Sequence, residues 1–346
     1  MKQTNFFLHI SKIILFSGIL VATASARAEL KVVTTIKPLH SLISNVMDGV
    51  GEPGLIIDGS ISPHSFTMKP SHAKMLEEAD VIFWIGESIE TSMEEPLDSI
   101  AKDAEVIEFM ELDSIAKLKF REESIFGDHD DHDDHDDHDD HDDHDDHDDH
   151  DDHDDHDDHD DHDDHDDHDD HAGHEGHNHG EFDAHIWLDP SNAKEMVHEI
   201  ARELGDLDPA NKDKYEANAE ATINALDQLI SDVGTDINSD AKFVVFHDAY
   251  QYFEERFGVR AAGALTLNTD VLPGAKQIAD IQDVIKDKGI KCIFSEPQFN
   301  PKIITTIAED MNIKTGVFDP LGANIDPGKS LYFKLISNLG NELKGC

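Results

Sequence analysis

Short runs of apolar residues alternate with longer amphipathic stretches along most of the chain. The apolar runs, bounded by polar or turn-forming residues, predict buried strands, and apolar positions three or four apart predict helices. The predicted strands are 30–35, 54–57, 81–85, 105–109, 242–246, 260–265, 292–295 and 314–318. The predicted helices are 39–48, 71–79 with Ser71 as N-cap, 191–204, 209–236, 250–257, 276–288, 301–311 and 330–343.

This alternation predicts the α/β fold class, and 346 residues suit two such domains better than one core. The longest predicted helix, 209–236, has Pro209 in a position that suits a first helical turn. At 1.5 Å per residue it forms a rod of about 40 Å, which is long enough to cross a domain boundary.

The first 28 residues do not belong to either domain. Lys2 and Lys12 make a basic start, a short apolar run follows, and Ala26-Arg27-Ala28 presents small residues at a cleavage site. This pattern predicts a secretory signal peptide that is cleaved after Ala28. No later segment reaches the roughly 18 apolar residues of a membrane helix, so we expect a soluble, exported protein.

Charge is distributed very unevenly along the chain. The formal net charge of −50 excludes nucleic acid as a natural partner. Much of it lies in residues 128–180, where His-Asp-Asp repeats place a histidine at every third position from 129 to 171. Without apolar residues to bury, this segment is predicted to be a disordered loop that interrupts the first domain.

The loop contains 18 histidines beside carboxylates, and that chemistry suits weak zinc sites. One hypothesis is a zinc reservoir; the alternative is a solvated acidic spacer that arose by repeat slippage. The candidate ligands include His129, His132, His135, His171, His174, His177 and His179.

Two cysteines occur, Cys292 and Cys346. An even count in an exported protein suggests a disulfide, although two buried or reactive thiols are the alternative.

Histidines outside the loop differ in their predicted surroundings. His9 leaves with the signal peptide, and His72 and His198 lie among polar neighbours on predicted helices, which indicates solvated side chains. His40 lies early in a helix, where a surface role is favoured over a ligand role.

Three histidines remain, His64, His185 and His247, each at the end of a strand or in the loop that follows one. Ligands of open α/β sheets gather beyond the carboxyl ends of strands. Three imidazoles plus one oxygen make a common four-coordinate zinc site. Their separations of 121 and 62 residues are, alone, a weak signal.

Local motifs strengthen the signal. They are 58–70 (DGSISPHSFTMKP), 79–86 (ADVIFWIG), 185–190 (HIWLDP), 245–250 (VFHDAY), 294–299 (FSEPQF) and 319–322 (DPLG). In combination they resemble the metal-receptor class of binding proteins that serve ABC-type importers. The resemblance covers nearly the whole mature chain, and the histidine-rich insert resembles the zinc-uptake branch.

The resemblance implies two α/β lobes joined by one long rigid helix, with the metal in the cleft between them. His64 and His185 would come from the first lobe and His247 from the second. In manganese-binding relatives a carboxylate replaces the third histidine, so His247 favours Zn²⁺. Asp319 matches a second-lobe ligand that zinc-specific relatives often replace by water, and Glu296 is expected to support His247 from outside the metal shell.

The resemblance also implies a Cys292–Cys346 disulfide and delivery of Zn²⁺ to an inner-membrane ABC permease. We therefore expect a periplasmic, monomeric zinc receptor that is not an enzyme. The expected division is a signal peptide at 1–28, lobes at 29–208 and 237–346, and a linker helix at 209–236.

Three alternatives stay open. The first is a manganese or broad-specificity metal receptor. The second is a secreted zinc hydrolase. Against it, the sequence contains no His-Glu-x-x-His motif and no residue assigned as general base. The third is a metal buffer in which the repeat is the active part.

Overall fold

The computed structural model describes residues 29–126, 180–267, 269 and 273–346. The predicted signal peptide lies outside these residues, as does the predicted loop up to residue 179 with all its candidate zinc ligands. Within the part of the chain that the structure describes, no helix combines the length and apolar character needed to cross a membrane.

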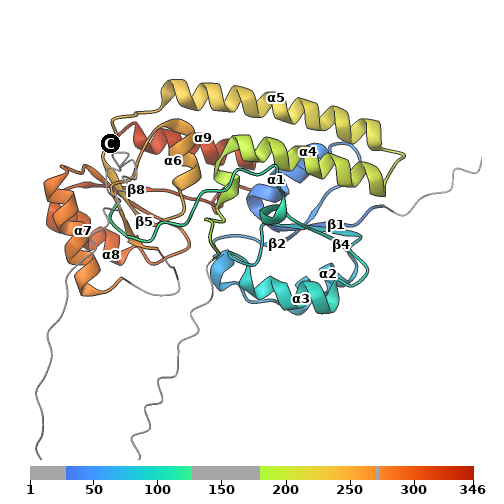
Figure 1. The fold of residues 1–346 in the computed structure, drawn as a ribbon, viewed down its shortest axis with the longest axis horizontal. Helices are drawn as coiled ribbons and strands as arrows, with labels where there is room; N and C mark the ends of the chain where they lie inside the picture. The colour runs from blue at the N-terminus through green and yellow to red at the C-terminus, as the bar shows by residue number, and fades with distance from the viewer. Residues whose placement is uncertain (1–28, 127–179, 268, 270–272) are drawn as a thin grey trace, which may run out of the picture.

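A parallel four-stranded sheet with strand order β2-β1-β3-β4 forms the first lobe. Its strands are β1 (Val32–Ile36), β2 (Gly54–Ile57), β3 (Val81–Trp84) and β4 (Glu105–Glu108). The central strands β1 and β3 are buried at every position, as expected for a parallel sheet covered on both faces. The helices of this lobe are α1 (Lys37–Val46), α2 (Pro70–Glu77), α3 (Glu94–Ile100) and α4 (Pro190–Leu207) (Figure 1).

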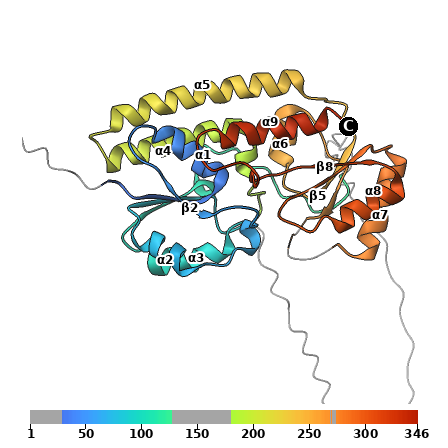
Figure 2. The same ribbon diagram turned by 180° about the vertical axis from the view of Figure 1, so that it is seen from behind.

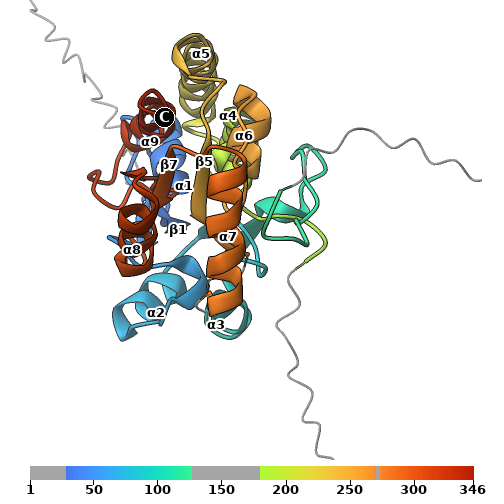
Figure 3. The same cartoon turned by 90° about the vertical axis from the view of Figure 1, so that its left-hand side faces the viewer.

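The second lobe repeats this design with the strand order β6-β5-β7-β8, again parallel. Its strands are β5 (Phe243–His247), β6 (Ala264–Thr266), β7 (Cys292–Ser295) and β8 (Lys314–Val317). Its helices are α6 (Gln251–Phe257), α7 (Ala275–Asp287), α8 (Lys302–Met311) and α9 (Leu331–Leu343). Figure 3 views this lobe end-on, with α7 and α8 toward the viewer.

Side chains of β5 alternate between two cores. Val244 and Phe246 pack into the cluster that includes residues of α7 and α8, whereas Phe243 and Val245 join the larger core. His247 has the same parity as Phe243 and Val245, so it leaves the carboxyl end of the strand on the side of the larger core.

The long helix α5 (Lys212–Asp236) extends over both lobes (Figures 1 and 2). Its buried positions are three or four residues apart and form one stripe: Tyr215, Ala219, Thr222, Leu226, Leu229 and Val233. It packs mainly against α4, and also against α1 and α9. The predicted fold class, two α/β lobes joined by a long helix, is confirmed.

Some predicted boundaries were wrong. Helix α5 begins at Lys212 rather than at Pro209, because Asp208 accepts from the backbone N–H of Asn211 and closes a turn there. Helix α2 begins at Pro70, with Lys69 rather than Ser71 as its N-cap. Proline is suited to the first helical position. Helix α3 was not predicted.

The segment 118–126 crosses from the first lobe to the second, where it pairs with the residues predicted to begin a strand at 260. Ile125 forms an antiparallel bridge with Gly263. The Ser124 carbonyl oxygen accepts from the Ala264 N–H, and the Phe126 N–H donates to the Ala262 carbonyl oxygen. Strand β6 itself begins at Ala264, four residues after the predicted start.

A second connection, residues 318–331, returns from β8 to α9 and lies against the first lobe. The buried Lys37 donates to the carbonyl oxygens of Gly322 (2.8 Å) and Ala323 (3.0 Å). Trp187 Nε1 donates to the Pro320 carbonyl oxygen at 2.7 Å. The lobes are therefore joined by α5 and by two further stretches of chain.

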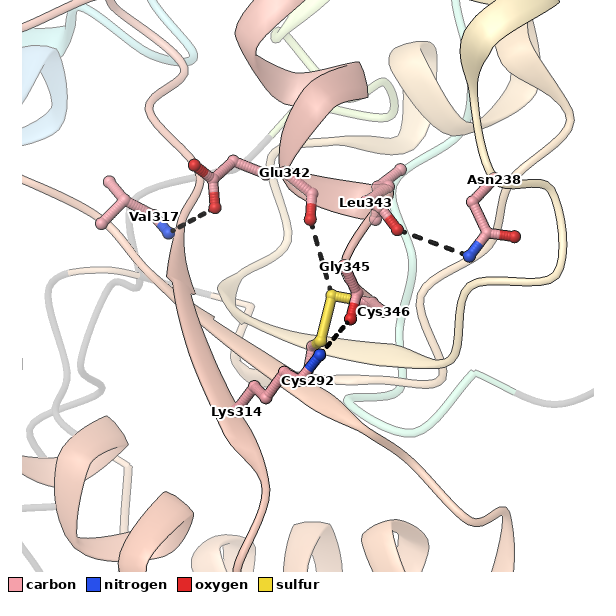
Figure 4. Close-up of a disulfide and its surroundings, with 8 residues drawn as sticks. All are labelled: Asn238, Cys292, Lys314, Val317, Glu342, Leu343, Gly345 and Cys346. Atoms are coloured by element: carbon pink, nitrogen blue, oxygen red, sulfur yellow. Dashed lines mark hydrogen bonds between the residues drawn. A yellow bond between two sulfur atoms is a disulfide. The ribbon is translucent and has the colours of Figure 1, made fainter.

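The predicted disulfide between Cys292 and Cys346 is present, with a sequence separation of 54 (Figure 4). It attaches the chain after α9 to the beginning of β7. Lys314 Nζ adds a hydrogen bond to the Gly345 carbonyl oxygen at 2.7 Å.

Candidate metal centre

Three histidines from separate parts of the chain meet between the lobes. His64 lies in a short 3₁₀ turn, Pro63–Ser65, that follows β2. His185 directly precedes the turn Ile186–Leu188, which leads into α4. His247 is the last residue of β5. The predicted position, at the end of a strand or in the loop after it, is confirmed for His64 and His247. It was wrong for His185, which enters a helix and follows an isolated bridge at Phe182 rather than a strand.

The imidazole rings lie close together. The ring centroids are 5.6 Å apart for His64 and His185, 5.5 Å for His64 and His247, and 4.9 Å for His185 and His247. One ligand nitrogen of each lies within 4.8 Å of the other two. Among the described residues, no other group of three or more His, Cys, Asp or Glu has this arrangement.

Two of the rings are held by buried carboxylates. His185 Nδ1 lies 2.7 Å from Asp183 Oδ1, and His247 Nδ1 lies 3.3 Å from Glu296 Oε2. Carboxylates accept hydrogen bonds, so each Nδ1–H donates and each Nε2 is left for a metal. Burial lowers the pKa of His247, but the charge and hydrogen bond of Glu296 outweigh burial and the net shift is upward.

Asp319 has a different environment. Its Oδ1 accepts from the backbone N–H of Gly322 at 3.0 Å, and its Oδ2 accepts from that of Ala323 at 2.6 Å. Gln298 Nε2 also donates to it at 3.2 Å. The structure thus joins Glu296 to the histidine cluster through His247, whereas Asp319 organises the turn that follows β8.

Small hollows flank the three histidines. One, of about 20 Å³, is lined by all three together with Phe120, Phe182 and Leu267, among others. The other, of about 10 Å³, is bordered by Trp187, Glu296 and Pro320. Spaces of this size accommodate about one water molecule. The arrangement supplies three nitrogen ligands and room for one small oxygen ligand.

The surrounding charge is mostly negative. Asp248, beside His247, and Glu254 in α6 are both buried, and Arg121 binds them at 2.8 Å and 2.7 Å. Burial raises the pKa of Asp248 to about 7, although Arg121 opposes this shift. Several carboxylates and one guanidinium therefore surround the position of a bound dication, and their summed charge attracts it.

The other three histidines of the described residues lie outside the cluster. His40 contacts the Pro53 carbonyl oxygen at 3.2 Å, and burial lowers its pKa. His72, predicted to be solvated, is partly buried: it stacks on Phe66 and accepts a hydrogen bond from the Lys69 backbone N–H. His198 is exposed, as predicted.

Sequence reasoning assigned no role to Asp183 or Arg121. Asp183 was visible only as an acidic residue two positions before a candidate ligand, and that spacing is the one signal that pointed to it. Arg121 gave no signal, because its two partners are more than 120 positions away in the sequence.

Comparison with known proteins is consistent with this geometry. The family model for the zinc-uptake complex component A, periplasmic (ZnuA), matches residues 32–346. A high-affinity zinc uptake system protein ZnuA of Brucella abortus is 49% identical over 317 residues, covering 91% of each chain. The protein of the same name from Yersinia pestis is 30% identical over 334 residues, covering 96% of each chain.

Solved structures share the fold. A crystal structure of ZnuA has a TM-score of 0.66 at 20% identity and covers 90% of this chain and 98% of its own. The binding protein FpvC from Pseudomonas aeruginosa, in complex with Mn²⁺, has a TM-score of 0.67 at 20% identity, with 92% and 99% covered.

Proposed function

The chain belongs to the ZnuA family of periplasmic zinc-uptake components, and we propose that it binds one Zn²⁺ through His64, His185 and His247. Family membership makes it a zinc-binding receptor of a zinc-uptake system. The residues that hold the ion are our assignment. The observation that carries it is the approach of three imidazoles, contributed by both lobes, to within 4.8 Å of one another.

The donor set supports zinc over manganese. Three imidazoles suit Zn²⁺, whereas Mn²⁺ favours carboxylate and water oxygens. Tetrahedral zinc with bonds of about 2.0–2.1 Å requires ligand nitrogens about 3.3 Å apart. The ligand nitrogens lie within 4.8 Å of one another, so zinc binding requires them to move somewhat closer together. We propose water as the fourth ligand, because the oxygens of Asp319 are already engaged by backbone N–H groups.

We further propose that the receptor is exported by cleavage after Ala28 and acts as a monomer that delivers Zn²⁺ to an ABC-type permease of the inner membrane. The three ligands come from a single chain, which supports a monomeric site. The proposed lobes are 29–208 and 237–346, linked by 209–236, with the sheets β2-β1-β3-β4 and β6-β5-β7-β8 as their centres.

Residues 128–180 are proposed to be a reservoir of weak zinc sites that supplies the centre between the lobes. The composition supports this role, since imidazole beside carboxylate binds zinc. Each of these sites is expected to bind zinc more weakly than the centre between the lobes.

Single alanine substitutions test the ligand assignment. In protein lacking residues 128–179, His64→Ala, His185→Ala and His247→Ala are each expected to weaken zinc binding at least 100-fold, because each removes a nitrogen ligand. His198→Ala, on the exposed face of α4, is the control and is expected to change nothing. Calorimetry with a competing chelator measures the affinities, and an unchanged affinity in two of the three variants refutes the assignment.

The hydrolase alternative is tested separately. The family is one of solute-binding receptors, and we propose that the centre has no hydrolytic activity. Zinc-loaded protein is expected to release no product from a panel of ester and peptide substrates. Turnover that disappears in His247→Ala would support an enzyme instead.

A further inference from the structure

Asp183 makes two hydrogen bonds to the residue that we propose as a zinc ligand. Its Oδ1 lies 2.7 Å from His185 Nδ1 and accepts from the His185 backbone N–H at 2.9 Å. Both residues are nearly inaccessible, with 2% of Asp183 and 4% of His185 exposed. One carboxylate oxygen thus restrains both the main chain and the ring of His185.

These two hydrogen bonds determine the tautomer and the orientation of the His185 imidazole. Because the carboxylate accepts the Nδ1–H, the neutral ring carries its free lone pair on Nε2. The backbone contact prevents Asp183 from following a rotation of the ring. Removal of such an outer partner typically weakens metal binding by 10- to 100-fold.

The main chain of Asp183 is in turn held by the second lobe. Tyr252 of α6 donates its hydroxyl hydrogen to the Asp183 carbonyl oxygen at 2.6 Å. The same hydroxyl accepts from the Leu118 backbone N–H at 3.0 Å, while the Asp183 N–H donates to the Leu118 carbonyl oxygen at 2.9 Å. Residues 118 and 183 are therefore fixed to each other and to α6.

We propose that Asp183 is a positioning residue for the zinc ligand His185, and that Tyr252 makes this positioning depend on contact between the lobes. The proposal rests on the zinc-binding role of His185. A displacement of α6 would move Asp183 and with it the ring of His185. Weakening of the zinc site would then follow from a small shift in the lobe contact.

Asp189 offers a matched control on the same segment. It is similarly buried, at 6% exposed, and its Oδ1 accepts from the Ser191 backbone N–H at 2.7 Å to cap α4. It also pairs with Arg256 of α6 at 2.6 Å, so its loss removes another contact between α6 and the first lobe but leaves the bond from the Tyr252 hydroxyl to Asp183 in place. Its loss is expected to lower thermal stability without changing a contact of His185.

The experiment compares Asp183→Ala, Asp183→Asn and Asp189→Ala in protein lacking residues 128–179. Asp183→Ala is expected to weaken zinc binding by about 10- to 100-fold. Asp183→Asn, which keeps an oxygen acceptor, is expected to lose less and provides a variant that folds if alanine does not. Asp189→Ala is expected to retain parental affinity. An affinity of Asp183→Ala within twofold of the parent, or an equal loss in Asp189→Ala, overturns the proposal.

Two further measurements separate positioning from general damage. The visible absorption spectrum of bound Co²⁺ is expected to change in both Asp183 variants and to be unchanged in Asp189→Ala; unchanged spectra in the Asp183 variants contradict positioning.

The zinc affinity of His185→Ala is measured in parallel. If its affinity matches the parent, the ligand assignment itself fails; if it is weakened while Asp183→Ala is not, only the positioning role fails.

Tyr252→Phe tests the dependence on the second lobe. It removes only the hydroxyl that joins Leu118 and Asp183, and zinc binding is expected to weaken about three- to tenfold. Tyr215→Phe is the control, because that hydroxyl bonds to Asp208, beside the start of α5. Equal affinities of the two variants would remove Tyr252 from the proposal.

Discussion

Glu90 is a fully buried carboxyl in the first lobe, remote in sequence from the proposed zinc ligands. Its Oε2 accepts from the backbone N–H groups of Ile85 (2.9 Å) and Gly86 (3.3 Å). Burial raises its pKa from 4.5 to about 7, and the hydrogen bonds from the backbone N–H groups of Gly86 and Ile85 only partly offset that effect. The folded protein therefore binds a proton at this position in a range where the unfolded chain does not.

The upward shift predicts the sign of a pH effect. Folding takes up a proton between about pH 4.5 and 7, so the free energy of unfolding falls as pH rises through this window. Glu90→Gln removes the ionisation and is expected to be more stable than the parent at pH 8, by up to about 3 kcal/mol. At pH 4 the two proteins are expected to differ little.

Urea unfolding of metal-free protein at pH 4, 6 and 8 measures the difference. Glu87→Gln, an exposed neighbour, is the control and is expected to follow the parent at each pH. A stability difference between parent and Glu90→Gln that does not grow with pH would contradict the prediction.

At the scale of elements, the disulfide secures the end of α9. That helix buries seven residues, Leu331, Tyr332, Leu335, Ile336, Leu339, Gly340 and Leu343, against the rest of the molecule. Cys346 lies three residues after the last residue of this helix and joins β7 through Cys292 (Figure 4). Because α9 packs on both α1 and α5, it links the second sheet to a helix of the first lobe and to the long connecting helix.

Removal of the disulfide is expected to destabilise the protein without affecting the metal ligands. By restricting the unfolded chain, a disulfide between residues 54 positions apart is expected to raise the free energy of unfolding by about 4 kcal/mol. Cys292→Ala/Cys346→Ser is expected to lower the free energy of unfolding by about that amount while zinc affinity stays within twofold. A double variant as stable as the oxidised parent would show that packing of α9 alone holds the end of the chain.

At the scale of the whole molecule, the lobes are connected too extensively for a wide hinge motion. Helix α5 extends over both, residues 118–126 pair with the second sheet, and Lys37 contacts the connection before α9. We expect metal-free and zinc-bound structures to superpose as nearly rigid bodies, with differences confined to loops near the histidines. A rotation between the lobes of more than about 20° would contradict this expectation; closures of that kind occur in receptors with flexible hinges.

Zinc capacity is the second property of the whole molecule. Protein lacking residues 128–179 is expected to bind one zinc ion tightly, and the full chain several more weakly. Protonated imidazole does not bind metal and the ordinary pKa of histidine is about 6.5, so the extra capacity is expected to fall between pH 7.5 and pH 6. Calorimetric titration of both proteins at the two pH values measures this. Equal stoichiometry at pH 7.5 would make the segment a spacer.

Local patterns in the sequence determined the elements and much of the site. Continuous apolar runs specify buried parallel strands, and β2 and β7 have the predicted bounds. The first residues of helices α2 and α5 were not predicted correctly. Where a helix begins depends on hydrogen bonds such as those to the carbonyl oxygens of Asp208 and Lys69, and these form only in the folded chain. The three histidines that we propose as ligands were found from local motifs, two of which lie at strand ends.

The supporting contacts were decided by tertiary structure. Arg121 meets Asp248 and Glu254, and Tyr252 meets Asp183, only because the segment 118–126 crosses to the second lobe. Such contacts join residues far apart in the chain, and no local periodicity encodes them. The sequence thus indicated the residues that we propose as zinc ligands, whereas the packing of the two lobes determined how those residues are held.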